Sequence, residues 1–476
     1  MSLKKMQWNK LLCSERQGYE RHPNEDPHNR NPFERDYDRI IFSESFRRLK
    51  DKTQVFPIND NDHVHNRLTH SLEVSCIGRS LGRIIGVHIL EKHKESLGEL
   101  VSKEGLTEAS FGAIVQAACL AHDIGNPPFG HSGENAIQAW FYSEIGKKHL
   151  EELTLQERED LELFEGNAQG FRIITRVEGQ TGRMGMQLTY AILATFSKYP
   201  RESLLEIRDD NIVLTQEHQS RTSAKKYGFF QSEKEIFKEI AEKVGLIRID
   251  DNLAWWCRHP LAFLVESADD ICYLIMDFED GFNTGYIDYS TTIDLLSDIA
   301  GKEHLDFLQK ASDKSVRREN IRYLRGKAIN KLIEVVVEAF KNHEDELLTG
   351  SFDRPLLHTN TQNINQKIQN IKNEIKNKVY KCQEVLSIEV AGYDVVSGLL
   401  NEFIIAVNEE QSIVYINKKN KKSEKIKEMI PRQTMFNGQQ GSKNYLNILR
   451  VTDYISGMTD SYAVSLFKKI KGISLG

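Results

Sequence analysis

The chain has 476 residues, a formal net charge of −6, and six cysteines without paired metal-ligand spacing. This length exceeds one small domain, but no Pro- or Ser-rich linker divides the chain. The acidic balance argues against general coating of nucleic acid, although it leaves room for a local basic groove, and the scattered cysteines indicate a reducing compartment.

Targeting and membrane signals are weak in this sequence. No run approaches the 18 apolar residues of a membrane span, and the first residues lack the apolar centre of a signal peptide. We therefore expect a cytoplasmic protein with no membrane-embedded part.

The first informative segment carries His70. The apolar residues Leu68, Leu72, Ile77, Leu81 and Ile84 predict a largely buried helix that runs to about His93. A single His on such a face is more often a core residue than a ligand. Arg67 lies one turn before it on the same face, where a cation would suit an anionic phosphate beside a metal ligand.

The pair His122-Asp123 follows an apolar segment with helical spacing. We expect the pair in the last turn of a helix that Gly125 ends and that Pro127-Pro128 cannot continue. Adjacent helical side chains point about 100° apart, so both can bind one metal only near a helix end. The position of this pair therefore predicts two metal ligands.

The stretch from Pro260 to Gly281 is also predicted to be a helix. Asp269, Tyr273 and Asp277 share one stripe at i, i+4 and i+8, roughly 12 Å long, which matches a nucleoside plus a phosphate. Taken alone, this stripe is better explained as an acidic helix face that is exposed to solvent. Three separate segments together predict a site of two His and two Asp, which is typical of a metal-dependent phosphohydrolase.

The remaining patterns predict a mainly helical, all-α fold with minor short β-strands. Long helices are expected from Val101 to Gly125, Ser315 to Leu348 and Asn363 to Val395, and short strands at Asp210 to Thr215 and Gln411 to Asn417. The charged, poorly periodic stretch from Tyr199 to Ile249 is interpreted as an insertion over or beside the site. The lysines from Lys418 to Lys427 are either a solvated loop, the more common case, or a nucleic-acid contact.

Several longer motifs resemble one known family, the HD-domain deoxynucleoside triphosphate triphosphohydrolases, and within it the bacterial dGTPase type. The likeness covers most of the chain and is carried by Trp8–Leu12, Arg35–Ser43, Phe46–Leu49, Lys52–Pro57, Arg67–Val74, Phe164–Gln169 and Asp453–Asp460, in addition to the His-Asp pair. Motifs of this length are far more specific than a bare His-Asp dipeptide.

The resemblance implies a role for each matching position. It implies metal ligation by His70, His122, Asp123 and Asp269, catalysis by His131 and Glu134, and substrate binding by Gln54, Val55, Arg67, Tyr273 and Asp277. Asp270 departs from the pattern, because vertebrate SAM-and-HD relatives carry a phosphate-binding Lys there. The compensating cation is left open between Arg48, Arg450 and another residue.

Two imidazoles and two carboxylates suit a divalent metal ion such as Mn²⁺, Fe²⁺, Ni²⁺, Zn²⁺ or Co²⁺, and they can also accept Mg²⁺ at its cellular abundance. The resemblance implies attack at the α-phosphate that gives a deoxynucleoside and intact triphosphate. The leaving 5′-oxygen needs a proton, and His131, oriented by Glu134, is the candidate general acid. A loop histidine capped by a nearby carboxylate is the alternative.

The organisation that we expect has three parts. Residues 1–60 contribute to the nucleotide pocket, residues 61–285 form the HD core with an insertion at about 199–249, and residues 286–476 form a helical region packed on it. The resemblance further implies a homo-oligomer, with a hexamer as the first candidate size, and leaves open an effector role for single-stranded DNA or a nucleotide.

Two other functions stay open at this point. One is a different HD phosphohydrolase that acts on nucleoside monophosphates or on a guanosine tetraphosphate alarmone. The other is a nucleotide- or DNA-binding regulator without turnover. Among dNTPs we expect dGTP to be preferred, although Gln54 can both donate and accept and so leaves the base preference open.

Overall fold

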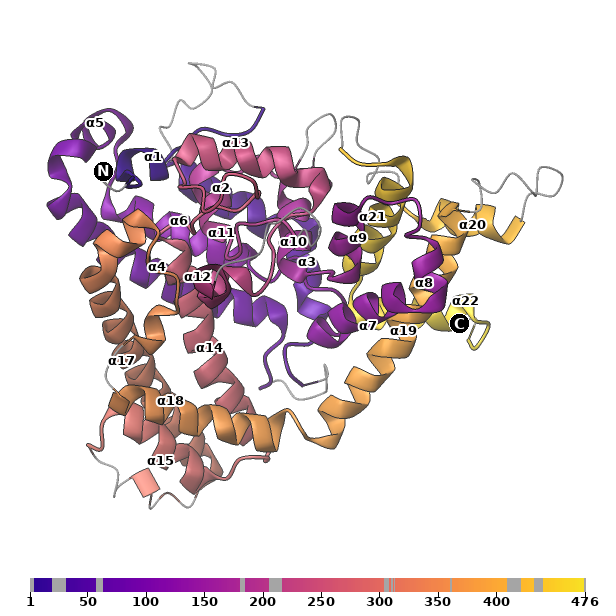
Figure 1. The fold of residues 1–476 in the computed structure, drawn as a ribbon. Helices are drawn as coiled ribbons and strands as arrows, with labels where there is room; N and C mark the ends of the chain where they lie inside the picture. Colours follow the sequence, from indigo (N-terminus) through magenta and orange to yellow (C-terminus); the bar gives the residue numbers. More distant parts are fainter. Residues whose placement is uncertain are drawn as a thin grey trace.

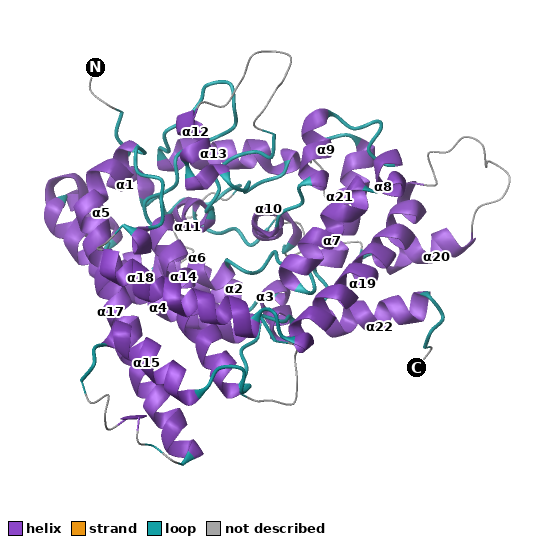
Figure 2. Ribbon diagram, turned by 60° about the horizontal axis from the view of Figure 1, so that its bottom comes forward, coloured by secondary structure: helices purple, strands orange, loops and turns teal. Residues whose placement is uncertain are grey.

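The computed structural model describes residues 4–18, 31–56, 63–179, 185–204, 216–303, 308–309, 311, 313–359, 362–408, 421–431 and 440–474. Regular structure in these ranges is helical (Figure 2), and the only β-type pairing within them consists of isolated bridges. The all-α prediction is confirmed. The two runs that were expected to be strands, 210–215 and 411–417, lie outside the described residues.

Three helices form the centre of the molecule: α4 (Arg67–Lys92), α6 (Glu108–Ala121) and α14 (Ala262–Asn283). Among the described helix pairs, α4 and α6 share the most extensive contact. At Gly82 of α4 an added Cβ would lie 2.6 Å from the Phe111 carbonyl oxygen of α6, so only glycine allows this approach. The close packing fixes the start of α4 relative to the end of α6, where the predicted ligands lie.

Other helices complete a first apolar core around these three. They are α1 (Trp8–Leu11), α2 (Pro32–Ile41), α3 (Glu44–Arg48), α5 (Lys94–Glu104), α11 (Tyr190–Phe196), α13 (Lys234–Val244), α15 (Tyr289–Ala300), α17 (Lys314–Thr349) and α18 (Gln362–Glu374). The short helix α12 (Gln216–Ser220) lies outside this core.

A second apolar core is built mainly from the C-terminal part of the chain. It contains side chains of α7 (Gly130–Tyr142), α9 (Leu155–Glu162), α10 (Gly166–Arg172), α19 (Gln383–Asn408), α20 (Lys421–Met429), α21 (Lys443–Ser456) and α22 (Asp460–Ile470), and α8 (Glu144–Lys148) follows α7. Figure 1 shows α19 running from the end of α18 to α7 and α22, so this helix links the two cores.

The helix predicted from Val101 to Gly125 is two helices. α5 ends at Glu104, Gly105 adopts the left-handed conformation with φ 67°, and α6 begins after Thr107. The Thr107 N–H donates to Ser110 Oγ at 3.2 Å. A glycine C-cap and a Thr N-cap two positions apart are local stop and start signals that the apolar spacing did not reveal.

The helix predicted from Asn363 to Val395 is also interrupted. α18 ends at Glu374, a single π-helical turn covers Ile375–Val379, and α19 starts at Gln383. The Tyr380 hydroxyl donates to Asp277 Oδ2 at 2.7 Å, which holds the chain at the break. Single π turns commonly occur where a helix is distorted to bring a side chain into a site.

The 199–249 segment is more regular than its sequence suggested. Ile236, Phe237, Ile240 and Val244 of α13 are buried at helical spacing against the first core, so the expectation of poor periodicity was wrong for this part. That the segment is an insertion, and that boundaries fall near residues 60 and 285, stay predictions.

Within the described residues, α19 is the one helix long and apolar enough to cross a membrane by length and composition. It is thus an exception to the expectation that no segment approaches this composition. Half of its apolar window is buried, and it packs on α7, α20, α21 and α22. Core helices of globular proteins share these properties.

Candidate active site

The start of α4 is fixed by a reciprocal cap. Asn66 Oδ1 accepts the Thr69 N–H at 3.0 Å, and Thr69 Oγ1 accepts the Asn66 N–H at 3.1 Å. Such a cap orders the first turn. His70 follows directly and is 1% exposed, so its ring has little freedom and is presented from a rigid turn.

His122 lies immediately after the last residue of α6, Ala121, as the helix-end argument predicted. Its Nδ1 lies 2.7 Å from the Cys119 carbonyl oxygen. A carbonyl can only accept, so Nδ1 carries the proton when the ring is neutral and Nε2 keeps a free lone pair. The ring is therefore oriented to use Nε2 as a ligand atom.

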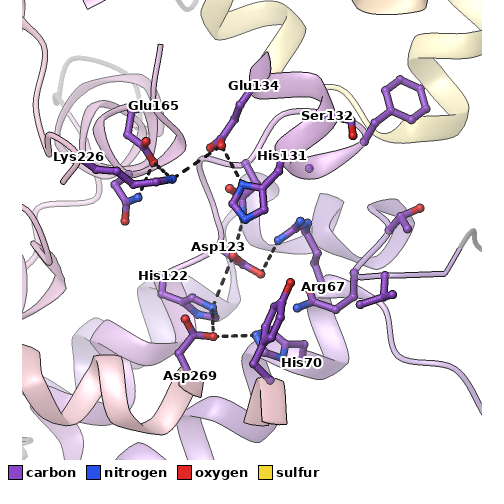
Figure 3. Close-up of a pocket in the computed structure, with 18 of the residues that line it drawn as sticks. Arg67, His70, His122, Asp123, His131, Ser132, Glu134, Glu165, Lys226 and Asp269 are labelled. Atoms are coloured by element: carbon purple, nitrogen blue, oxygen red, sulfur yellow. Dashed lines mark hydrogen bonds and ion pairs between the residues drawn. The ribbon is translucent and has the colours of Figure 1, made fainter. Parts of the chain in front are cut away.

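The predicted ligands from three segments converge in space (Figure 3). One ligand atom each of His70, His122 and Asp269 lies within 4.8 Å of the others. Asp269 Oδ1 is 3.2 Å from His70 Nε2 and 3.5 Å from His122 Nε2. This group could hold a metal ion.

Asp123 lies at the edge of this group. Its Oδ1 is 3.5 Å from His122 Nε2 and accepts a hydrogen bond from the Asn126 side-chain amide. Its Oδ2 accepts from Arg67 at 2.8 Å. The structure therefore brings Asp123 next to the three-residue group, with both oxygens engaged by polar neighbours; its role as fourth ligand stays a prediction.

The electrostatics of the group favour a cation. Burial alone would raise the pKa of both carboxyls, but His122 and His70 hold the pKa of Asp269 well below its usual value, while Arg67 and His122 lower that of Asp123 to about 2. Burial would lower the pKa of His122, but the two carboxylates raise it to about 9. The buried carboxylate of Asp123 and the half-buried carboxylate of Asp269 thus face the imidazoles.

The donor set fits a divalent metal ion. Two imidazole nitrogens and carboxylate oxygens form a site of intermediate softness, which suits first-row transition metals and accepts Mg²⁺. When the His122 ring is neutral, its Nε2 carries the free lone pair that ligation requires. These properties do not select one metal.

A second catalytic candidate lies on the next helix. His131 Nδ1 is 2.9 Å from Glu134 Oε2, and Glu134 Oε1 accepts the Gly166 N–H at 2.8 Å. The hydrogen bond that His131 donates to the Glu134 carboxylate raises the pKa of His131, although burial opposes this. Burial would raise the pKa of Glu134, but the contacts with His131 and Lys226 lower it. The pair is thus poised to hold a proton on His131.

The loop before α7 brings this pair close to Arg67. Phe129 has φ 64°, which is unusual for a residue with a side chain, and Gly130 has φ 57°. A Cβ at Gly130 would lie 2.5 Å from an Arg67 guanidinium nitrogen. Glycine at this position therefore lets the guanidinium lie against the backbone that leads to His131.

The four predicted metal ligands, Arg67, and the His131–Glu134 pair line one cavity of about 530 Å³. Lys198 and Lys226 also line it, and the sequence reasoning did not identify either residue. Lys198 Nζ is 3.5 Å from Glu266 Oε1, and Lys226 Nζ is 2.9 Å from Glu165 Oε1. Each lysine directly precedes a tyrosine, but this pattern does not indicate a functional site. Tertiary packing places the two lysines in the cavity lining.

Most of the predicted substrate residues line the same cavity: Gln54, Val55, Arg67 and Tyr273. Asp277 is buried and is absent from the described lining, where Tyr380 stands and donates to its carboxylate. The carboxylate of Asp277, which was predicted to bind substrate, is therefore engaged by the hydroxyl of Tyr380 in this structure. The sequence reasoning did not identify Tyr380 as a residue of the cavity lining.

The two other candidate cations lie elsewhere. Arg48 pairs with Glu44 at 3.6 Å, Arg450 donates to the Ile430 carbonyl oxygen at 3.4 Å, and neither lines the cavity. Lys198 and Lys226 are the lysines that the described part of the cavity offers beside Arg67.

Comparison with known proteins gives consistent matches. A model of the HD domain matches residues 67–195. A deoxyguanosinetriphosphate triphosphohydrolase-like protein of Synechocystis sp. is 44% identical over 99% of this chain and 100% of its own length, and one of Pseudomonas aeruginosa is 39% identical over 98% and 99%. A deoxyguanosinetriphosphate triphosphohydrolase of Salmonella arizonae is 29% identical over 93% and 94%.

Proposed function

The chain belongs to the deoxyguanosinetriphosphate triphosphohydrolase-like family of HD-domain hydrolases, and we propose that it cleaves dNTPs, dGTP above others, into a deoxynucleoside and inorganic triphosphate. The observation that carries the proposal is that the group of His70, His122 and Asp269 and the pair of His131 and Glu134 line one cavity.

We propose that the activity depends on a divalent metal held by His70, His122, Asp123 and Asp269. When bound, such an ion polarises a phosphate oxygen and lowers the pKa of a bound water. The carboxylates of Asp123 and Asp269 stay charged by virtue of their low pKa, and the Cys119 carbonyl keeps His122 in the ligating tautomer.

The reaction needs a proton donor on the leaving side. A bond forms between a water oxygen and the α-phosphorus, the bond from that phosphorus to the 5′-oxygen breaks, and the 5′-oxygen takes a proton from His131. The attacking water releases one proton to solvent, its remaining hydroxyl stays on the triphosphate, and His131 regains a proton from solvent after the deoxynucleoside leaves. Glu134 keeps the imidazolium charged before transfer and, being buried, directs the ring into the cavity.

Binding of the triphosphate is assigned to cations of the cavity lining. Arg67 is 6% exposed and its Nε has no hydrogen-bond partner, so one buried donor awaits an acceptor. Lys198 and Lys226 supply two more positive charges on the same lining. Guanidinium and ammonium groups of this kind bind phosphate oxygens.

The nucleoside end is assigned to Gln54, Val55, Tyr273 and the Tyr380–Asp277 pair. Gln54 Oε1 is buried without a donor, which suits a sugar hydroxyl or a base N–H. An unpaired buried acceptor is costly, so a ligand that supplies the donor is favoured over one that lacks it.

The test is product analysis with Mn²⁺ and each dNTP, GTP, dGMP and guanosine tetraphosphate, with products separated by anion-exchange chromatography. We expect deoxynucleoside and intact triphosphate, fastest from dGTP, and loss of turnover in Asp123→Ala. Turnover of only the monophosphate or the tetraphosphate would replace the proposal with another HD phosphohydrolase, and binding without turnover would favour a regulator.

From the family resemblance we also propose that the protein forms a homo-oligomer, with a hexamer as the first candidate size. We further propose a cytoplasmic location and an effector role for single-stranded DNA or a nucleotide. In the described part of the lysine cluster, Lys422 Nζ pairs with Glu402 Oε2 at 2.7 Å. Residues 418–420 lie outside the described residues. Light scattering with and without an oligonucleotide tests both assembly and effector binding.

A further inference from the structure

A second cavity of about 330 Å³ lies at the C-terminal part of α14, where three segments meet. Its lining combines the residues before α4, the end of α14 and the first turns of α17: His63, His65, Glu279, Phe282, Asn283, Arg318, Ile321, Arg322 and Arg325. Ten residues of α14 separate Asp269 from Glu279, roughly 15 Å along the helix axis, so this cavity is apart from the candidate active site.

The arginines converge because of their spacing on α17. Arg318, Arg322 and Arg325 stand at i, i+4 and i+7 and therefore share one helix face. Ile321 is 1% exposed, and its burial in the first core turns this face toward α14. The cluster is thus built by a fixed helix surface.

The arginine charges are only partly balanced. Arg325 pairs with Glu279 at 2.8 Å, whereas Arg318 Nη1 lies 3.2 Å from the imidazole nitrogen Nε2 of His63 and has no carboxylate partner there. The Arg318 Nε is buried and has no hydrogen-bond partner. No ion pair or hydrogen bond involves Arg322 among the described residues.

His65 lies in the same lining, and two carboxylates both hold its ring in the charged form and balance that charge. Burial would lower its pKa, but hydrogen bonds with Asp280 and Glu73 raise it to about 10. Its Nδ1 is 2.8 Å from Asp280 Oδ1, and its Nε2 is 3.3 Å from Glu73 Oε2. Asp280 and Glu73 are thereby occupied, so Glu279 is the one carboxylate in the described lining.

The cavity lining thus holds an unpaired guanidinium donor, Arg318 Nε, and more arginines than carboxylates. Such a lining favours an anion that accepts several hydrogen bonds. Guanidinium groups match phosphate geometry, and several fixed cations favour a multiply charged group over a single carboxylate. We propose that this cavity binds a phosphate group of a small molecule, at a site separate from the candidate active site. The group belongs either to a nucleotide or to a free polyphosphate.

Calorimetric titration of the full-length protein with inorganic triphosphate, with a chelator present to prevent turnover, tests the proposal. The double variant Arg318→Gln/Arg322→Gln should lose one class of site, or bind there at least roughly tenfold more weakly, while a second class remains. Arg67→Gln should show the opposite pattern. The matched control is Lys314→Gln/Lys327→Gln, which removes two charges from α17 outside the lining and should titrate like the wild type.

The proposal is overturned if Arg318→Gln/Arg322→Gln titrates like the wild type, or if the lysine control weakens binding equally, because the effect is then general charge. Retained dGTP turnover and an unchanged circular dichroism spectrum in the double variant exclude misfolding. The two variants therefore distinguish the two proposals. Arg318→Gln/Arg322→Gln tests the second site, whereas Arg67→Gln tests triphosphate binding in the candidate active site.

The source of the phosphate is decided in the Arg67→Gln background. Tighter binding of dATP than of inorganic triphosphate at the remaining site identifies a nucleotide, and equal binding identifies a free polyphosphate. Binding of a single-stranded oligonucleotide there, with neither small anion bound, contradicts the proposal.

Discussion

Asp460, at the start of α22, accepts the backbone N–H of Phe129 through Oδ1 at 2.9 Å, although the two residues are 331 positions apart in the chain. Its Oδ2 accepts the Thr53 N–H at 2.9 Å. One buried carboxylate therefore joins the segment that carries Gln54 to the loop that leads to His131. Lys52 reinforces the joint, since its Nζ donates to the carbonyl oxygens of Asn126 and Ser456.

Asp460→Asn should therefore lower kcat through loss of loop position. The amide can accept one of the two backbone hydrogen bonds and leaves the other N–H buried without a charged acceptor, which costs about 1.5–3 kcal/mol of stability. We expect kcat to fall at least about tenfold while far-ultraviolet circular dichroism is retained. Asp394→Asn, an exposed Asp on α19, is the matched control and should leave kcat unchanged. An unchanged kcat in Asp460→Asn would show that the loop holds its position without this carboxylate.

The His131–Glu134 pair predicts the alkaline limb of the pH profile. A general acid works only when protonated, so activity should be present below the pKa of His131 and fall as pH rises through it. Because Glu134 raises that pKa, Glu134→Gln should move the limb to lower pH as well as reduce kcat. Glu389→Gln removes a charge from the cavity lining without touching His131 and serves as the control for kcat/KM profiles. An alkaline limb that stays in place in Glu134→Gln would count against His131 as the acid.

The three-residue group predicts stabilisation by metal. A ligand that binds only the folded state at about 100 times its Kd adds about 2.7 kcal/mol, which raises Tm by several degrees. Scanning fluorimetry after dialysis against a chelator should show this rise on adding Mn²⁺, and its loss in His122→Ala. His358→Gln, outside the cavity lining, should keep the rise. An equal rise in His122→Ala would place the stabilising metal elsewhere.

Gly125 is the point where the ligand pair approaches α10. An added Cβ there would lie 2.1 Å from the Gly170 backbone nitrogen and 2.2 Å from the Gly166 carbonyl oxygen, both rigid atoms. Gly125→Ala should destabilise the protein by at least about 1–3 kcal/mol in urea unfolding, with lower activity because Gly166 holds Glu134. Gly98→Ala is the opposite control: nothing lies within 4 Å, and it sits inside α5, so we expect about 0.5–1 kcal/mol of stabilisation. If both alanine variants unfold at the same urea concentration, the close approach to α10 is not rigid.

Local signals in the sequence determined much of this protein. Apolar spacing predicted both ends of the helix that carries Asp269 to within two residues, and the end of the helix that carries His70 to within one residue. The helix-end position of His122-Asp123 and the three-residue spacing of His131 and Glu134 are also local. These features can be predicted from neighbouring residues in the sequence, without knowledge of the rest of the chain.

Tertiary structure alone decided which distant residues complete the site. Lys198, Lys226 and Tyr380 reach the cavity, and Asp460 reaches its loop, because helices of two cores pack together; no local pattern encodes such contacts. The break before α19 likewise follows from Tyr380 binding Asp277 of another helix. Local propensity specifies where helices form, whereas the packing of their buried faces specifies which side chains meet. The complete cavity depends on this packing.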